Sequence, residues 1–243
     1  MILELDIGNT RCKWRVLDAA GVTLVDGACQ SAALGAELGA LACRAGLRRV
    51  RAACVRGEAV EREIAGAVAG ALGLEVEFAR SQREAAGVRN SYAEPGRLGV
   101  DRWLARLAGF AVSAGAVCVF DCGSAITADL VDADGLHRGG YIVPGIAMMR
   151  TSLLAATDRV RFEAAGLAPD VAPGTSTAQA VTHGTLLAAA GLLRAAREQF
   201  AERCPAAPVL LTGGDAGTLQ PWLDFPVTLR PQLVLDGLRL ALP

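Results

Sequence analysis

The stretch "LELDIGNTRCKWRVLDAAG", residues 3–21, decides the fold, because the chain gives nearly the same pattern a second time. Two largely apolar runs, 1–7 and 12–18, flank the short polar turn "GNT" and predict a β-hairpin. Beginning at residue 118, "CVFDCGSAITADLVDADG" repeats a D-x-G turn between two apolar runs. This repetition indicates an internal duplication rather than two coincidences.

An offset of 115 residues aligns the two stretches. It pairs Asp6 with Asp121, Gly8 with Gly123, Asn9 with Ser124 and Val16 with Val131, and after one deletion "DAAG" falls on "DADG". The period is too long for a solenoid, so the repeat predicts two related α/β domains with mixed sheets that face each other. We place the first domain at 1–115 and the second at 116–243. The alternative is two unrelated hairpins that share an aspartate–glycine turn.

The rest of the chain predicts alternating strands and helices. Apolar runs bounded by turn residues predict strands at 22–27, 50–55, 74–78, 138–145 and 208–216. Apolar residues at helical spacing predict helices at about 32–46, 58–72, 145–156 and 178–202, one that begins near 103, and a last one at 233–242.

Composition excludes several classes of protein. With 52% hydrophobic and 20% charged residues the chain can bury a large core, and its net charge of −1 gives no basic surface for nucleic acid. Its seven cysteines form no C-x-x-C pair, which argues against a zinc ribbon or a disulfide framework. The acidic start and the absence of a long apolar run predict a cytoplasmic protein without a signal peptide or membrane span.

Two D-x-G hairpins can form a clamp for nucleotide phosphates, because backbone N–H groups surround the phosphates while carboxylates handle metal ions. Asp6 would help to hold hydrated magnesium, and Asn9, Thr10 and Lys13 would meet the β- and γ-phosphates. Lys13 is the only lysine among the 24 basic residues, and its compact charge suits phosphate; the alternative is a solvated lysine on a hairpin. The glycine pair at 213–214 would let the backbone approach the nucleotide closely.

A second motif, "NSYAEPGRLGVDRW" at 90–103, supplies acid–base chemistry. Asp101 is a candidate general base that would accept a hydroxyl proton during phosphoryl transfer. Arg102 offers a planar fork that suits a substrate carboxylate. The alternative is an adjacent ion pair that opens the following helix.

Over nearly its whole length the chain resembles the type III pantothenate kinases, a family that includes the Bvg accessory factors. The resemblance rests on six motifs in the family's order and spacing: "DIGNT", "LGVDR", "DCGSAITAD", "GGYIVPG", "GTSTAQAVTHG" and "LTGGDA". It implies the actin-like ATPase / acetate and sugar kinase fold. It also implies a homodimer with a shared active site that phosphorylates pantothenate with ATP and Mg²⁺ and needs a monovalent cation, K⁺ or NH₄⁺.

The resemblance also implies roles for individual residues. Those that would bind ATP are Asp6, Ile7, Gly8, Asn9, Thr10, Arg11, Cys12, Lys13 and Ser124. Those that would bind pantothenate are Tyr92, Gly99, Val100, Asp101, Arg102 and Thr177. Asp101 would be the proton acceptor and Asp121 the ligand of the monovalent cation.

Ser124 is the one departure, since the family usually has threonine there; the hydroxyl is kept, so only the affinity for ATP is in question. His137 and His183 receive no role. Two other functions remain open: an actin-like kinase or phosphatase for another small molecule, because fold alone does not choose a substrate, and a regulatory accessory protein, which would need neither Asp101 nor Arg102.

Overall fold

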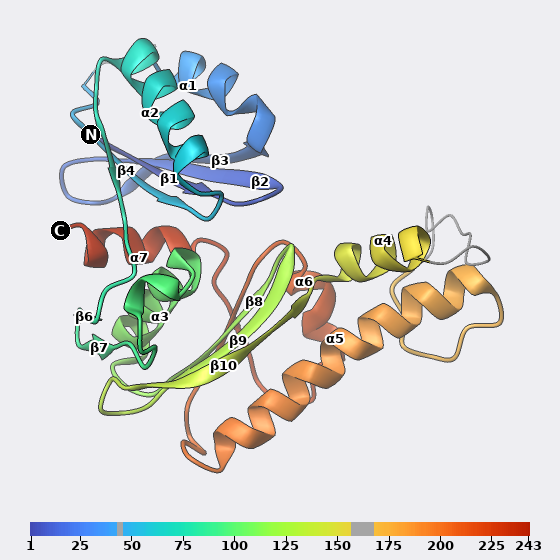
Figure 1. Ribbon diagram of the computed structural model, residues 1–243. Coiled ribbons are helices and arrows are strands. Elements are labelled where there is room, and N and C mark those ends of the chain that lie inside the picture. Colours follow the sequence, from blue (N-terminus) through green and yellow to red (C-terminus); the bar gives the residue numbers. More distant parts are fainter. Residues whose placement is uncertain (43–45, 157–167) are drawn as a thin grey trace. The chain divides into compact units, whose positions relative to one another are not determined.

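The computed structural model describes residues 1–42, 46–156 and 168–243 (Figure 1). The chain forms two compact units, Met1–Ala108 together with Gln232–Pro243, and Gly109–Pro231. Each unit is built around a five-stranded sheet of mixed parallel and antiparallel strands. Within the described residues, no helix is long and apolar enough to cross a membrane.

The two sheets have the same topology. In the first unit the strand order is β3-β2-β1-β4-β5, with β1 Ile2–Ile7, β2 Arg11–Leu17, β3 Thr23–Gln30, β4 Arg49–Cys54 and β5 Val76–Phe78. In the second it is β10-β9-β8-β11-β12, with β8 Val117–Cys122, β9 Ala125–Val131, β10 His137–Pro144, β11 Val209–Thr212 and β12 Thr228–Leu229. The predicted duplication is therefore confirmed.

The turns after the two hairpins agree in detail. Asp18 Oδ1 accepts hydrogen bonds from the backbone N–H groups of residues 20 and 22, and Asp132 Oδ1 accepts them from residues 134 and 136. These turns are the "DAAG" and "DADG" segments. In both copies, the hydrogen bonds from the backbone to one aspartate side chain stabilise the turn in which the chain reverses direction.

The strand register corrects one pair of the sequence alignment. Ile2 lies opposite Leu17, and Val117 lies opposite Val131. Val131 is therefore equivalent to Leu17 and not to Val16, because the deletion falls in the turn itself. Residues 8–10 join β1 to β2, whereas only residues 123 and 124 join β8 to β9.

Helices cover one face of the first sheet. α1 (Leu34–Ala42) and α2 (Glu58–Leu72) pack on the face that carries the odd-numbered residues of β1, around Leu3, Leu5 and Ile7. The predicted helix at 32–46 extends into residues 43–45, which lie outside the described residues. Two short strands, β6 (Glu84–Ala85) and β7 (Val88–Arg89), and the 3₁₀ turns η1 (Ser31–Ala33) and η2 (Pro95–Arg97) complete this part of the chain.

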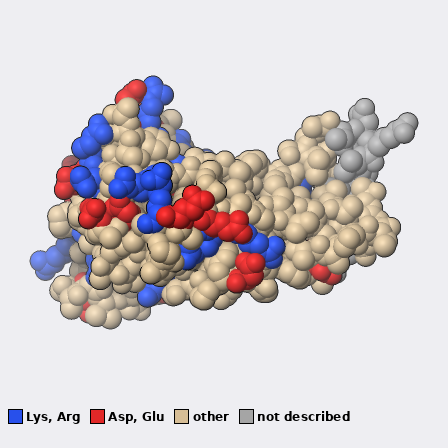
Figure 2. Space-filling view, turned by 90° about the horizontal axis from the view of Figure 1, so that it is seen from below, with Lys and Arg blue, Asp and Glu red and all other residues tan. Residues whose placement is uncertain are grey.

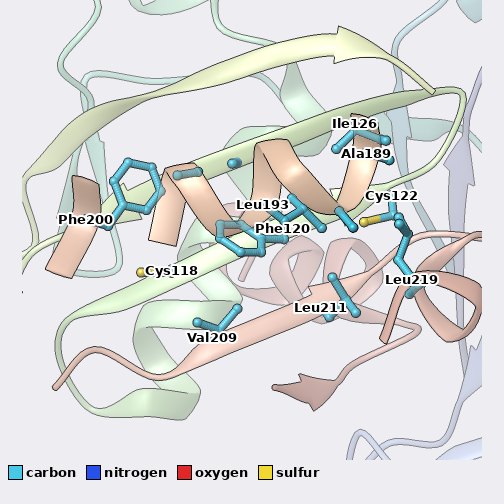
Figure 3. Packing of buried hydrophobic residues seen from close by; sticks show 14 of the residues in the cluster. Cys118, Phe120, Cys122, Ile126, Ala189, Leu193, Phe200, Val209, Leu211 and Leu219 are labelled. Carbon is cyan, nitrogen blue, oxygen red and sulfur yellow. The ribbon is translucent and has the colours of Figure 1, made fainter. Parts of the chain in front are cut away.

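In the second unit, α5 (Thr177–Ala201) lies along one face of the sheet, with α4 (Ile146–Ala156) beside its N-terminal part (Figure 1). Leu193 of α5 lies beside Phe120 of β8 in Figure 3, and Phe200 of α5 and Leu211 of β11 belong to the same buried cluster. A short α6 (Ala216–Leu219) and the 3₁₀ turn η3 (Gln220–Trp222) follow β11. These buried apolar contacts are the main source of stability for this unit.

The last helix, α7 (Leu233–Ala241), belongs to the first unit. It contacts β1 and β4, and its Gly237 is packed so closely on Leu104 that a Cβ atom would lie 2.2 Å from the Leu104 carbonyl oxygen. The sequence-based division assigned these residues to 116–243, because nothing local in the sequence shows that the chain returns to its first sheet. The division between the units falls inside α3 (Val100–Ser113).

On the face seen in Figure 2, basic and acidic side chains lie close to one another rather than in a stripe of one sign. The six cysteines that the structure describes are free thiols. Burial raises the pKa of the Cys118 thiol to about 12 and also raises that of Cys122. Such thiols stay protonated at neutral pH and act as small apolar side chains.

Candidate active site

The first hairpin presents an exposed turn at the end of two buried strands. Gly8 N–H donates to the Arg11 carbonyl oxygen at 3.0 Å, and Ser31 Oγ donates to the Gly8 carbonyl at 3.1 Å. A Cβ atom on Gly8 would lie 2.9 Å from that Arg11 oxygen, so the tight turn needs glycine. Asn9 and Thr10 are exposed at its tip. The turn can therefore offer backbone N–H groups and small polar side chains to an anion.

Opposite charges flank this turn. Asp6 on β1 lies directly opposite Lys13 on β2, so the two side chains share one face of the sheet. On its other side Asp6 lies opposite Ala53 of β4, which adds no charge. Cys12, the neighbour of Lys13, is fully buried and lies opposite Cys29. Burial and Cys29 raise the pKa of the Cys12 thiol, so this cysteine supports the hairpin as an apolar residue.

The second hairpin places Asp121 in a different setting. Asp121 lies opposite Thr127 on one side and opposite Thr212 on the other, so a carboxylate stands between two hydroxyls. The Thr212 hydroxyl is buried and has no hydrogen-bond partner among the described residues. Oxygen ligands of this kind suit a hard cation.

Glycines make room around Asp121. Gly213 has a φ of +93°, and a Cβ atom there would lie 2.6 Å from Asp121 Oδ1 and 2.4 Å from the Cys122 carbonyl oxygen. A Cβ atom on Gly145 would lie 2.2 Å from the Gly123 carbonyl. The turn that holds Ser124 is thus enclosed by backbone from two other segments, which only glycine allows.

These features fit a nucleotide–metal complex held partly through water. Within the described ranges, no group of three His, Cys, Asp or Glu side chains could hold a metal ion by itself. A magnesium ion at such a site keeps several waters and is bound through one or two carboxylates and the substrate phosphates. The first hairpin offers one such carboxylate, Asp6, beside the Lys13 ammonium.

The segment before α3 brings three of the predicted substrate residues together. Arg102 Nη1 donates to the Tyr92 hydroxyl at 3.0 Å, and the Arg102 backbone N–H donates to Asp101 Oδ1 at 2.7 Å. A Cβ atom on Gly99 would lie 2.6 Å from the same Asp101 oxygen, which is why glycine precedes the helix here. Asp101 lies in the first turn of α3, where the helix dipole stabilises its negative charge.

The predicted residues are divided between the two units. Residues 6–13, Tyr92 and 99–102 lie in the first unit, whereas Asp121, Ser124 and Thr177 lie in the second. Thr177 is the first residue of α5, whose N-cap Ser176 accepts a hydrogen bond from the Gln179 N–H at 3.2 Å. The structure therefore groups the base with the arginine fork and the tyrosine, and it does not group Thr177 with them inside one unit.

A pocket of about 170 Å³ in the second unit was missed by sequence reasoning. Arg150 on α4 and Asp215 at the start of α6 line it, and Arg150 Nε donates to the Thr185 hydroxyl at 3.1 Å. Burial raises the pKa of Asp215, and the positive charge of Arg150 opposes that shift. Asp215 lies in the "LTGGDA" motif, but no local pattern distinguishes Arg150 from the other arginines.

Both histidines have structural partners. His137 is 1% exposed, and its Nε2 lies 3.0 Å from Asp129 Oδ1. His183 Nδ1 lies 2.7 Å from the Ala172 carbonyl oxygen. These contacts explain both side chains without a catalytic role.

Sequence comparisons relate the whole chain to one family. The sequence model described as type III pantothenate kinase matches residues 2–199. A type III pantothenate kinase from Pseudomonas aeruginosa strain LESB58 is 38% identical over 250 residues, which cover 100% of this chain and 99% of that protein. One from Pseudomonas putida strain W619 is 41% identical over 249 residues, with the same coverage.

Structural comparisons place the fold among actin-like ATPases and sugar kinases. A Campylobacter jejuni protein assigned to the Baf family of transcriptional activators has a TM-score of 0.63 at 20% identity, covering 98% of this chain and 95% of that one. The activator of the 2-hydroxyisocaproyl-CoA dehydratase from Clostridium difficile, with bound ADPNP, has a TM-score of 0.51 at 11% identity, covering 99% of this chain and 92% of that one. At these identities the likeness concerns the fold alone.

Proposed function

Because the chain belongs to the type III pantothenate kinase family, we infer that it transfers the γ-phosphoryl group of ATP to the primary hydroxyl of pantothenate. The product is 4′-phosphopantothenate, and the reaction is the first step of coenzyme A biosynthesis. The family match, which covers residues 2–199, carries the choice of substrate. The geometry of the two hairpins and of the segment before α3 supports the roles of individual residues.

The nucleotide is proposed to bind along both hairpins. Residues 6–13 would surround the phosphates with backbone N–H groups and with the Lys13 ammonium, and Ser124 would add a hydroxyl from the second unit. The glycine pair 213–214, of which Gly213 is packed against Asp121, would let the backbone approach the nucleotide. Electrostatic stabilisation of the transferred phosphoryl group is the main contribution of such a site.

Two cations are proposed to act here. Asp6 would hold Mg²⁺ through water, which neutralises the charge that develops on the phosphates. Asp121, between the hydroxyl-bearing Thr127 and Thr212, would bind the monovalent cation, K⁺ or NH₄⁺. The two carboxylates thus serve different ions although they occupy equivalent places in the two sheets.

Pantothenate is proposed to lie against residues 99–102, with Tyr92 and Thr177. The Arg102 fork would pair with the pantothenate carboxylate, and Tyr92, which accepts a hydrogen bond from that guanidinium, would fix its direction. Asp101 would accept the proton of the attacking hydroxyl as the new phosphorus–oxygen bond forms. Arg102 is 6% exposed, so its guanidinium has little freedom to adopt other positions.

A homodimer in the cytoplasm completes the proposal. Three neighbouring elements of the second unit carry large apolar residues that are 37–59% exposed: Tyr141, Ile142, Met148, Leu153 and Leu187. They lie on β10, α4 and α5, and the end of the second unit that carries α4 shows few charged side chains in Figure 2. A surface of this kind favours a protein partner, and a second copy of the chain would bring its Thr177 to the pantothenate site.

Mixing two defective variants tests the shared site. Asp101→Asn and a disruptive Thr177 variant, each nearly inactive, should regain up to about a quarter of wild-type activity once subunits exchange, because half of the dimers are mixed and each mixed dimer has one intact site. If exchange is demonstrated and no activity returns, both residues act within one chain.

A coupled ADP-release assay tests the substrate. Pantothenate should support ADP release, and other carboxylated alcohols should not. Asp101→Asn should lower turnover by about two to four orders of magnitude while ATP still binds; Asp134→Asn, in an exposed turn, is the matched control. ADP release with another alcohol in place of pantothenate would support a different small-molecule kinase, and no release with any alcohol would support the regulatory alternative.

A further inference from the structure

A compact segment between β5 and α3 carries Tyr92, and one buried side chain holds it together. Asn90 is 4% exposed, and its amide Nδ2 donates to the carbonyl oxygens of Gln82 at 3.2 Å and Pro95 at 3.3 Å. Its Oδ1 accepts from the Tyr92 backbone N–H at 3.0 Å. A single amide therefore joins both sides of the segment to the residue that bears the tyrosine ring.

An arginine holds the same residue from the other direction. Arg83 Nη1 donates to the Tyr92 carbonyl oxygen at 2.9 Å, and Nη2 donates to the Ala93 carbonyl at 2.8 Å. The Asn90 backbone N–H in turn donates to the Arg83 carbonyl at 2.9 Å. Both backbone polar groups of Tyr92 are thus bound by side chains rather than by a helix or a strand.

The end of the segment is fixed in the same way. Ser81 Oγ donates to the Leu98 carbonyl oxygen at 2.8 Å, immediately before Gly99 and the start of α3. The backbone that carries Tyr92 and the backbone that carries Arg102 are consequently parts of one closed structure, in which the tyrosine hydroxyl and the guanidinium are 3.0 Å apart.

We propose that Asn90 and Arg83 are positioning residues for pantothenate: they hold the Tyr92 backbone so that its hydroxyl orients the Arg102 fork toward the substrate carboxylate. This proposal rests on the proposed function of Tyr92 and Arg102. Neither positioning residue needs to touch the substrate. A guanidinium binds a carboxylate bidentately only within a narrow range of angles, so a small rotation of the fork weakens substrate binding.

The expected defect is specific to one substrate. Asn90→Asp keeps the acceptor for the Tyr92 N–H but replaces the two N–H donors with an oxygen that faces two carbonyls. Arg83→Lys keeps the charge but cannot bind the carbonyls of residues 92 and 93 together. Each change should raise the KM for pantothenate by about tenfold or more and leave the KM for ATP unchanged, because the nucleotide hairpins are not part of this segment.

A double-mutant cycle separates positioning from general support of the fold. Tyr92→Phe removes the hydroxyl through which Asn90 and Arg83 act, so adding Asn90→Asp to Tyr92→Phe should raise the KM for pantothenate far less than Asn90→Asp does in the wild type. Arg97→Ala, which breaks only an exposed ion pair with Glu94 in the same segment, is the matched control and should be silent.

The outcomes are distinguishable. If Tyr92→Phe and Arg102→Lys leave the KM for pantothenate unchanged, the proposed substrate site is wrong. If those two variants raise the KM for pantothenate while Arg83→Lys and a folded Asn90→Asp do not, Asn90 and Arg83 are not positioning residues. The same conclusion follows if the effects of Tyr92→Phe and Asn90→Asp on this KM are additive. Circular dichroism melting establishes folding, and Arg83→Lys, at an exposed position, keeps the test usable if Asn90→Asp does not fold.

Discussion

The two sheets share a topology but differ in what lies on the face that bears the aspartates. Two residues before Asp6, the row across the first sheet reads Asp26, Arg15, Glu4, Arg51 and Glu77, with the charges alternating in sign. Two residues before Asp121, the row across the second sheet reads Gly140, Asp129, Val119, Leu210 and Thr228. Equivalent positions therefore carry an ion network in one unit and largely apolar or small side chains in the other.

The middle of the charged row, Arg15, Glu4 and Arg51, is buried and binds the C-terminal helix. Glu4 is 0% exposed; its Oε2 accepts from Arg15 Nε at 2.6 Å, and its Oε1 lies 3.1 Å from Arg51 Nη2. Arg15 also reaches Asp236 on α7 at 2.6 Å, and Arg51 Nη1 donates to the Leu242 carbonyl at 2.7 Å. The network thus attaches α7 to the first sheet.

The corresponding face of the second sheet has one buried pair, Asp129 with His137, and otherwise relies on close apolar packing. Gly109 on α3 packs so closely on Val119 that a Cβ atom would lie 2.9 Å from its side chain and 3.5 Å from Leu210. The equivalent faces of the two sheets are therefore packed differently, one with a buried ion network and the other mainly with apolar side chains. We therefore expect the stability of the first unit to depend on buried ion pairs and that of the second unit to depend on close apolar packing.

The largest effect on stability is expected at Glu4. Glu4→Gln would leave the buried Arg51 guanidinium without its ion pair and Arg15 with Asp236 as its remaining carboxylate, and breaking a buried pair in this way costs about 3–5 kcal/mol. Urea unfolding followed by circular dichroism should show this loss, whereas Glu75→Gln at an exposed position should change little. A loss below about 1 kcal/mol for Glu4→Gln would mean that the network does not stabilise the first unit.

A smaller loss is expected at the equivalent position of the second sheet. Val119→Ala removes two buried methyl groups and should cost about 1–3 kcal/mol, because Gly109 cannot move in to fill the space. The cost should be the same in low and high salt, since no charge is involved. A salt-dependent loss would show that Asp129, directly opposite, governs this position instead.

The smallest effect is expected at the exposed edge of the charged row. Arg49 hydrogen-bonds Glu77 and so lowers the pKa of that carboxyl below its ordinary value of 4.5. A carboxyl with a lowered pKa stabilises the folded state fully above its ordinary pKa, and that contribution is lost as the pH falls through the lowered pKa. Because Glu77 is 46% exposed, Glu77→Gln should cost less than about 1 kcal/mol at pH 7 and less at pH 3 than at pH 7, as thermal melts at both pH values would show.

Much of this fold could be predicted because it is encoded locally. The hairpins, the repeat and most helices follow from alternation, turn residues and helical spacing, and Tyr92, Asp101 and Arg102 are close in sequence. The network around Glu4 could not be predicted, since its partners on β4 and α7 come from distant parts of the chain. The three hydrogen bonds of Asn90 to backbone groups could not be predicted either. They depend on how the backbone folds between residues 82 and 95, which the sequence pattern does not show.

The central claim is that one repeated turn carries two functions, with Asp6 opposite Lys13 serving Mg²⁺ and the phosphates and Asp121 between two threonines serving the monovalent cation. The most direct test is to titrate K⁺ and Mg²⁺ separately against the pantothenate-dependent activity of Asp6→Asn and Asp121→Asn. Asp121→Asn should raise the half-saturating K⁺ concentration by about tenfold or more and leave the Mg²⁺ dependence unchanged, and Asp6→Asn should do the reverse. If Asp121→Asn keeps the wild-type K⁺ dependence, or if both variants change the dependence on the same ion, the two aspartates do not bind different cations.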